Sequence, residues 1–180
     1  MKNKKNNVLV LQCKNVMFLV LFLVFLFGFN VVGAIETFAT AESECGFKRE
    51  YFNAAWYYTM NYDDTIKQIV SLKDIYVKDL QQFTDRLYKD YNERGYTKGY
   101  SPSPGFDPKY YLSHHNDLLK TFGSTNYTAA LKHFCDQPLA GNEITRVKYS
   151  PYFNASEYKK NHGDLSSKSY CDLYKHFIRE

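Results

Sequence analysis

Residues 106–118 read FDPKYYLSHHNDL, and two other stretches of the chain follow the same pattern. Residues 52–64 read FNAAWYYTMNYDD, and residues 153–165 read FNASEYKKNHGDL. Each stretch begins with Phe and then Asn or Asp, with Tyr five positions after the Phe and Asp eleven positions after it. The starts lie 54 and 47 residues apart, which indicates an internal repeat of about three degenerate copies starting near residues 52, 106 and 153.

Each copy begins with residues that favour the first turn of a helix. Asn53, Asp107 and Asn154 follow the Phe and are suited to accept hydrogen bonds from the free amide groups of that turn. Pro108 comes next in the second copy, at the helical position that does not need an N–H donor. Each copy therefore predicts a helix of about two turns, which ends near a polar turn of the form His/Asn-x-Asp.

A second motif follows each copy and predicts a partner helix. The motif reads LYKDY at residues 87–91, ALKHF at 130–134 and LYKHF at 173–177. We expect these helices to run from about 126 to 135 in the second copy and from about 168 to 177 in the third. In the first copy, apolar residues recur at three- and four-residue steps from Ile69 to Tyr91, which predicts one longer amphipathic helix that stops at Gly95.

The composition agrees with a helical fold. The chain has 180 residues, with 17 Tyr and 14 Phe but 9 Gly and 5 Pro, so it has much aromatic surface to bury and few turn residues. We predict an all-α domain over residues 51–180, an array of short helix pairs with one longer inserted helix. Because each pair is too small to bury its own aromatic face, neighbours must stack, and the last helix is expected to end exposed at Glu180.

The N-terminus predicts export. Basic residues precede the apolar run VMFLVLFLVFLFGF at residues 16–29, and small residues follow at Ala34 and Ala41. This order is typical of a secretory signal peptide over residues 1–34, with cleavage after Ala34 or after Ala41. The alternative is an uncleaved membrane anchor, because the run extended to Val32 reaches the low end of a bilayer span. The expected location is secreted or at the cell surface.

The charge of the chain comes from this leader. The formal net charge is +4, and four lysines, Lys2, Lys4, Lys5 and Lys14, lie in the first 34 residues, which contain no acid. The remaining 19 of the 23 basic residues are balanced in number by 19 acidic residues. A neutral body has no electrostatic footprint for a phosphate backbone, so no nucleic-acid partner is expected, and a membrane partner is expected only if the leader is retained.

The cysteines allow at most one internal disulfide after export. Cys13 would leave with the leader, and Cys45, Cys135 and Cys171 would remain. The tentative pair is Cys135 with Cys171, because both fall in the repeated part, with one thiol left free or intermolecular. The alternative is that all three are reduced, buried residues. No spacing is typical of a zinc site, so neither a metal site nor a cofactor is expected.

The motifs of the second copy resemble a known helical repeat. The string Phe106-Asp-Pro-Lys-Tyr-Tyr-Leu112 with Asn116-Asp-Leu118, Phe122-Gly123 and Ala130-Leu-Lys-His-Phe134 is similar to a repeat found in tandem in exported bacterial surface and cell-wall-associated proteins. The resemblance extends over residues 51–180 and implies helical modules used for attachment or spacing, which in that family often accompany a separate hydrolase. The Gly-x-x-Glu-Gly-Arg turn of the family is kept only in part, around Gly95 and Gly99.

Two copies place a His and an Asp two positions apart, His115 with Asp117 and His162 with Asp164. If the protein is an enzyme, these are the candidate catalytic residues, since a His–carboxylate pair transfers protons. The structural interpretation is a polar turn that ends one helix and caps the next. The first copy has Asn61 in the His position, and Asn suits a turn better than a catalytic site, so the structural interpretation is favoured.

The tyrosine excess is the compositional signal for binding. Trp56, Tyr57, Tyr110, Tyr111 and Tyr158 fall in the repeated motifs and are the candidate binding residues, because aromatic rings give rigid contact surfaces for proteins or sugars. The alternative is that they fill the core. The sequence thus predicts an exported non-enzymatic module whose partner is cell-wall polymer, glycan or a surface protein. The alternative function is a small secreted hydrolase or effector that uses the His–Asp turns.

Overall fold

The computed structural model describes residues 39–69, 80–142 and 148–180, and these residues form helices and no β-strand. The chain divides into two compact units, Met1–Thr37 and Phe38–Glu180, and the helices described below belong to the second. The predicted all-α class is therefore confirmed, while the predicted leader lies outside the described residues. Within those residues, the search for a helix with the length and apolar character of a membrane span finds none.

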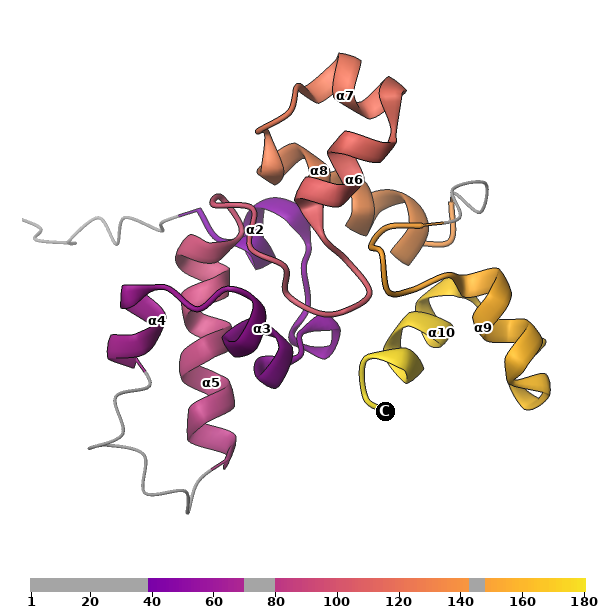
Figure 1. Cartoon of the computed structure of the whole chain (residues 1–180), viewed down its shortest axis with the longest axis horizontal. Coiled ribbons are helices and arrows are strands. Elements are labelled where there is room, and N and C mark those ends of the chain that lie inside the picture. Colours follow the sequence, from indigo (N-terminus) through magenta and orange to yellow (C-terminus); the bar gives the residue numbers. More distant parts are fainter. Residues whose placement is uncertain (1–38, 70–79, 143–147) are drawn as a thin grey trace, which may run out of the picture. The chain divides into compact units, whose positions relative to one another are not determined.

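The helices gather in three groups, which Figure 1 shows in violet to pink, salmon to orange and yellow. The first group, residues 52–95, contains α3 (Ala54–Met60), α4 (Asp64–Ile69), α5 (Leu80–Asp90) and the π-helical turn η2 (Tyr91–Gly95). The second, residues 106–139, contains α6 (Pro108–His114), α7 (Asn116–Phe122), α8 (Tyr127–Phe134) and a second π-helical turn, η3 (Cys135–Leu139). The third, residues 153–177, contains α9 (Ala155–Asn161), the 3-10 turn η4 (Gly163–Leu165) and α10 (Tyr170–Phe177). Before them come α2 (Ala41–Cys45) and the 3-10 turn η1 (Arg49–Tyr51).

The predicted helix starts are confirmed at α3, α6 and α9. The Asn53 side chain accepts a hydrogen bond from the Trp56 amide at 2.8 Å, and Asp107 and Asn154 accept equivalent bonds at the start of their helices. All three cap residues have extended backbone, as an N-cap requires. Because this interaction needs only neighbouring residues, the sequence motif is sufficient to place it.

The predicted partner helices are also confirmed, with one shifted start. The helix α8 lies within the predicted range and is capped by Asn126, whereas α10 begins two residues later than predicted because Ser169 caps it. The longer helix predicted for the first copy is observed as α5 and η2, which end at Gly95 as expected. Its predicted part over residues 70–79 lies outside the described residues.

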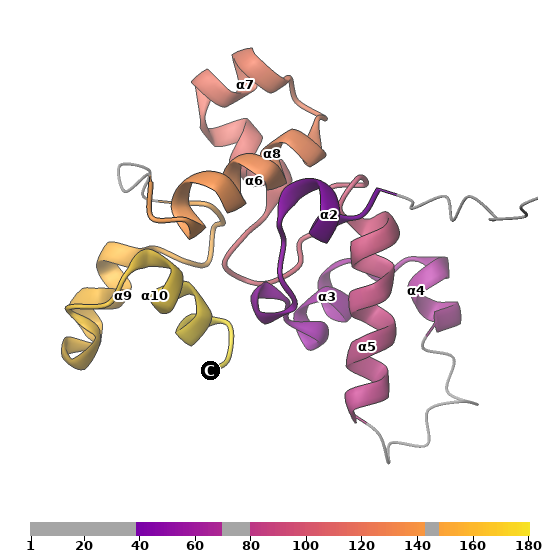
Figure 2. The same ribbon diagram turned by 180° about the vertical axis from the view of Figure 1, so that it is seen from behind.

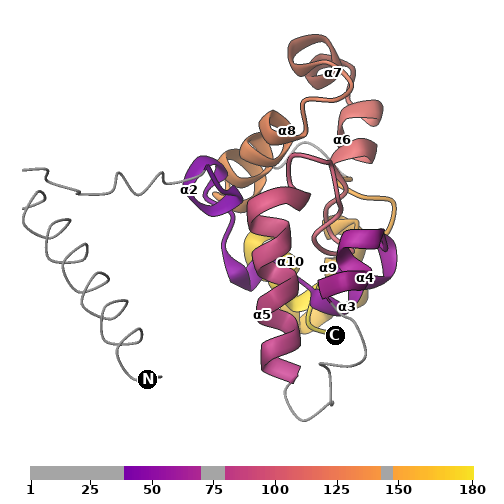
Figure 3. The same cartoon turned by 90° about the vertical axis from the view of Figure 1, so that its left-hand side faces the viewer.

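The structure adds α2, which the repeat pattern did not predict. Thr40 and Ser43 cap this helix reciprocally, and its residues Ala41 and Cys45 are buried. The helix packs against α8 and η2 (Figures 2 and 3). The compact unit therefore includes residues before 51, the predicted start of the helical domain.

Within each group, the Phe that begins the first motif contacts the aromatic residue that ends the second motif. The pairs are Phe52 with Tyr91, Phe106 with Phe134 and Phe153 with Phe177, with ring centroids 5.7, 4.1 and 4.6 Å apart. The last two pairs are stacked, and the first is tilted. The two motifs of each copy are thus joined by one ring contact, which explains why both recur in the same order.

Tyr174 of α10 is buried between the third group, the second group and the segment that precedes the first group. Its ring is fully buried and contacts the rings of Tyr51, Phe134 and Phe153. Its hydroxyl donates to the carbonyl of Tyr51 at 3.2 Å and shares a hydrogen bond with Ser103 Oγ at 2.5 Å. The Tyr174 ring also lies against the backbone of Gly105, so closely that a Cβ added at Gly105 would overlap the ring.

The third group closes back onto the first. The Asn53 side chain donates to the carbonyl of Ile178 at 2.8 Å, and Lys175 lies 3.8 Å from Glu50. Ile178, directly after α10, is only 5% exposed. The expectation that the last helix ends exposed is therefore wrong for its final turn, because that turn packs on the start of the first group; only Arg179 and Glu180 are exposed.

We expect Tyr174→Phe to destabilise the protein by about 1–3 kcal/mol, because it leaves the buried Ser103 hydroxyl without this partner. Tyr152→Phe removes a hydroxyl from a side chain that is 55% exposed and is expected to have almost no effect. Urea denaturation of both variants measures the difference. Equal stabilities would contradict the central role of the Tyr174 hydroxyl.

The cap of α2 bears on the two predicted cleavage points, Ala34 and Ala41, because the second would remove it. A chain that begins at Glu42 lacks Thr40 and the buried Ala41, and we expect it to be less stable than a chain that begins at Ile35 by about 1 kcal/mol from the cap alone. Thermal unfolding of the two chains tests this, with Thr40→Ala in the longer chain isolating the cap. The same unfolding temperature for all three would rule out the proposed role of the cap.

Candidate functional site

In each group, a tyrosine of the helix that carries the first motif (α3, α6 or α9) forms a hydrogen bond to the helix that carries the second motif (α5, α8 or α10). The bonds join Tyr57 to Asp90, Tyr111 to His133 and Tyr158 to His176, at 2.6, 2.9 and 2.7 Å. The partners occupy equivalent positions of the second motif, one residue before its final aromatic residue. Two histidines of the motif are thus used to hold the helices of a group together, and one group uses Asp instead.

The His residues of the candidate catalytic turns end their helices. His115 Nδ1 donates to the Tyr111 carbonyl at 2.8 Å, and His162 Nδ1 donates to the Tyr158 carbonyl at 2.9 Å. The Asn61 side chain donates to the Tyr57 carbonyl in the same way, at 2.9 Å. The predicted structural interpretation is therefore observed for the histidines, since Asn and His make the same helix-ending bond.

The carboxylates of the two turns lie beyond these caps and are exposed. Asp117 is in the first turn of α7, where a negative charge interacts favourably with the helix dipole, and Asp164 is in η4. In the first group, Asp63 accepts a hydrogen bond from the Ile66 amide and so caps α4, which is the role predicted for the carboxylate of this turn.

Asp63 also belongs to a charged network that sequence reasoning missed. Arg94 of η2 donates to both oxygens of Asp90 at 2.7 and 2.8 Å and to Asp63 at 2.9 Å. The hydroxyl of Tyr100 donates to the same Asp63 oxygen, while Tyr57 donates to Asp90. One guanidinium thus bridges two carboxylates from separate elements. The sequence holds one signal for this network: the second motif has Asp90 in the first copy, where the other two copies have His133 and His176.

The network shifts the pKa values of its members. Partial burial raises the pKa of Asp63, but hydrogen bonds from Tyr100, Ile66 and Arg94 outweigh it and hold that pKa well below its usual range. Burial raises the pKa of Tyr57 well above its usual value, and the hydrogen bond to Asp90 raises it further. At neutral pH, Asp63 is therefore ionised and Tyr57 is a neutral phenol.

Two of the five predicted binding residues are core residues. Tyr57 and Tyr111 are 0% exposed, so neither can contact a partner, and the prediction is corrected for both. Their positions face the second helix of the group, which requires the ring inside and the hydroxyl bonded. Trp56, Tyr110 and Tyr158 are half-buried and remain accessible on one side. Tyr110 stacks on the exposed His114 with ring centroids 3.8 Å apart.

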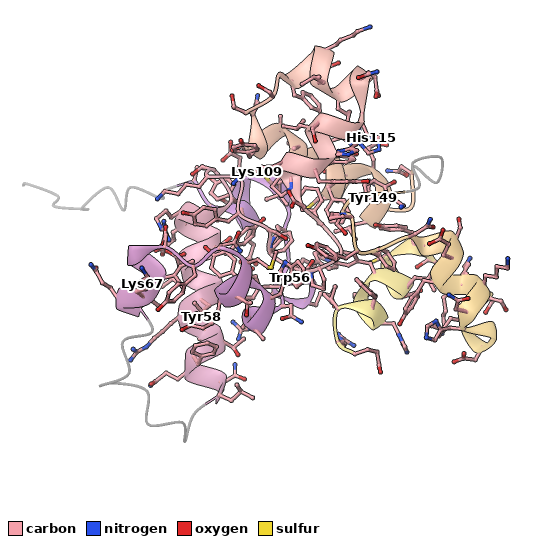
Figure 4. All side chains as sticks on the ribbon, in the orientation of Figure 1. Trp56, Tyr58, Lys67, Lys109, His115 and Tyr149 are labelled. Carbon is pink, nitrogen blue, oxygen red and sulfur yellow. The ribbon has the colours of Figure 1, made fainter. Side chains whose placement is uncertain are left out.

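Trp56 forms an aromatic pair with Tyr152, which sequence reasoning did not select. The rings meet edge to face with centroids 4.9 Å apart, although one lies on α3 and the other just before the third group (Figure 4 labels Trp56). The indole N–H donates to Ser101 Oγ at 2.9 Å, and the Tyr152 amide donates to Ser150 Oγ at 3.2 Å. A signal for Tyr152 is its position before Phe153, where the second copy has Gly105.

The predicted disulfide is not formed, and Cys45, Cys135 and Cys171 are all free thiols. The thiols have other neighbours: Cys45 Sγ donates to the Thr128 carbonyl at 3.6 Å, and Cys171 Sγ lies 3.9 Å from the Tyr51 hydroxyl. Burial raises the pKa of Cys45 to about 12. Burial also raises the pKa of Cys135, and the neighbouring Cys45 makes a smaller contribution in the same direction. Such thiols are poor nucleophiles, because the reactive form is the thiolate.

Comparison with known proteins adds no relative: no protein-family model, no curated protein and no solved structure matches the chain. The resemblance to the exported bacterial repeat therefore stays a prediction. Among residues 39–69, 80–142 and 148–180, no cluster of three His, Cys, Asp or Glu side chains has the arrangement of a metal site.

Asp63→Asn is expected to make stability less dependent on pH in acid. Because the pKa of Asp63 is lower in the folded chain than the unfolded value of about 3.9, its contribution is complete above about pH 4 and is lost as the pH falls through the lower, folded value. Urea denaturation between about pH 5 and pH 2 should show a smaller loss in the variant than in the natural chain. Asp117→Asn, at the equivalent position of the second group, is the control, and equal slopes for all three chains would refute this assignment.

Proposed function

We propose that the protein is an exported, non-enzymatic interaction module that attaches at a cell surface through exposed aromatic side chains. The observation that carries the proposal is the Trp56–Tyr152 pair, which is held in place by hydrogen bonds but leaves ring surface accessible. Large rings with a polar edge are the side chains that dominate binding surfaces, because they lose little conformational entropy on contact.

The pair has the rigidity expected of a binding platform. Trp56 is fixed by Ser101, whose hydroxyl donates in turn to carbonyls of the loop before the second group. Tyr152 follows Ser150, whose hydroxyl donates to the Pro104 carbonyl at 2.6 Å. The Trp56 indole and the backbone of Tyr152 are therefore both anchored to the same loop, residues 101–106, which reduces the conformational freedom lost on binding.

The use of the histidines supports a non-catalytic role. His115 and His162 end helices through Nδ1, and His133 and His176 bond to tyrosine hydroxyls. Each of these four side chains has an interaction that the fold needs. The alternative, a hydrolase or effector that uses His115, Asp117, His162 and Asp164, requires the same histidines to serve both purposes.

The partner class follows from the expected location. A chain exported by a signal peptide meets cell-wall polymer, glycan or a surface protein, and aromatic side chains are suited to the rings of a polysaccharide as well as to a protein surface. The proposed module needs no cofactor, and the neutral charge of residues 35–180 suits an uncharged partner.

Co-sedimentation with insoluble cell-wall material tests the proposal. We expect the protein to pellet without releasing soluble sugar or peptide, and Tyr152→Ala to reduce the pelleted fraction several-fold because half of the aromatic platform is lost. Tyr62→Ala is the matched control, since Tyr62 is 52% exposed and Tyr152 55%.

Released fragments that disappear in His115→Ala, with an unchanged melting temperature, would replace the proposal by the hydrolase alternative. Equal pelleting of the natural chain and both tyrosine variants would remove the platform from the proposal.

A further inference from the structure

The segment that follows the first group covers its first helix with a tyrosine. The ring of Tyr100 packs against the ring of Tyr57 with centroids 6.2 Å apart. The hydroxyl of Tyr100 donates to Asp63, the acid at the polar turn of this group. Tyr57 is fully buried as a result, and so is Tyr91 at 1% exposed.

The segment that follows the second group repeats the ring contact of this arrangement. The ring of Tyr149 packs against Tyr111 with centroids 5.3 Å apart and also contacts Phe134 and His115, beside which it lies in Figure 4. Tyr111 and Phe134 are both 0% exposed. In both cases Ser and Pro follow the covering tyrosine, as Tyr100-Ser101-Pro102 and Tyr149-Ser150-Pro151.

The third group has the same face without such a cover. Its tyrosine, Tyr158, contacts Phe153, His162 and Phe177. In the second group, Tyr111 makes the equivalent contacts with Phe106 and His115. Tyr158 and Phe177 are nevertheless half-buried, where their counterparts are fully buried. Among the described residues, the rings within 6.5 Å of Tyr158 all belong to the third group itself.

We propose that the face formed by Tyr158, His162, Asp164 and Phe177 binds a tyrosine-bearing extended segment of a partner polypeptide, of the chemistry Tyr-Ser-Pro. The face continues the interface by which each of the first two groups binds the segment after it, and that interface shows what fits. The incoming ring packs on Tyr158 and His162, as Tyr149 packs on Tyr111 and His115. The incoming hydroxyl donates to Asp164, as Tyr100 donates to Asp63.

The surroundings of the face have room for the rest of a peptide. His176, which bonds to Tyr158, also lines a hollow of about 450 Å³ with Leu165, Lys168 and Lys175 among its other lining residues. The proposal rests on the proposed non-enzymatic role and names a partner for a surface separate from the Trp56–Tyr152 pair. Tyr152→Ala alters only that pair, so the two proposals fail in different experiments.

Binding of a fluorescein-labelled peptide of residues 99–104, Gly-Tyr-Ser-Pro-Ser-Pro, to the purified full chain tests the proposal by anisotropy. We expect saturable binding, no binding of the Tyr→Ala peptide, and about three- to tenfold weaker binding of the Tyr→Phe peptide, which lacks the hydroxyl for Asp164. Asp164→Asn in the protein should weaken the tyrosine peptide by a similar factor and abolish the difference between the Tyr and Phe peptides. Asp117→Asn, at the equivalent position of the second group, should keep that difference.

Three results overturn the proposal. The first is absence of saturable binding at about 1 mM peptide, which is also the result if another segment of the chain or a second molecule already occupies the face. The second is equal binding of the Tyr→Ala peptide. The third is the same behaviour of Asp164→Asn and Asp117→Asn, in variants whose melting temperatures match that of the natural chain.

Discussion

The structure depends on one buried hydroxyl. Tyr174 brings a polar atom into the core, and a buried hydroxyl is tolerated there only if it has partners. Those partners are Ser103, in the loop before the second group, and the carbonyl of Tyr51, before the first group. The ring fixes the third group against the second through Phe134, and the hydroxyl joins the third group to the segments that precede the other two. The aromatic core around it fills space, but this hydroxyl determines which elements meet.

The tyrosine excess acquires a structural meaning from this core. Most of the repeated tyrosines are used as spacers with a polar end, which pack an apolar ring and bond a partner at a fixed distance. Fewer aromatic side chains stay accessible, and the two proposals rest on the Trp56–Tyr152 pair and on the half-buried face of the third group. A tyrosine-rich sequence is weak evidence for binding by itself, because the scaffold consumes the same side chains. The useful distinction is between a tyrosine that another segment covers and one that none of the described residues covers.

The parts of the fold that could be predicted are those decided within a few residues. Helix starts at Asn53, Asp107 and Asn154 depend on a cap and its own first turn, so the motif alone placed them. The bond from Arg94 to Asp63 and the bond from Asn53 to Ile178 join residues distant in sequence, and the repeat pattern marks the first only indirectly, by Asp90 in place of His, and the second not at all. The burial of two predicted binding tyrosines and the separate thiols were missed for the same reason. Burial is a property of the assembled groups, whereas the repeat describes only one group at a time.

The bond between Asn53 and Ile178 joins residues 125 positions apart, so the first helix group is completed by the end of the chain. Linear repeat proteins gain stability one neighbour at a time and unfold in pieces. The groups of this fold cannot unfold one at a time in that way, because each group lacks one side of its core until the others are present. The contacts of the fold are long-range, which slows folding. During synthesis the core stays open until the turn after α10 has been made, so a nascent chain that lacks residues 170–178 cannot complete the first group.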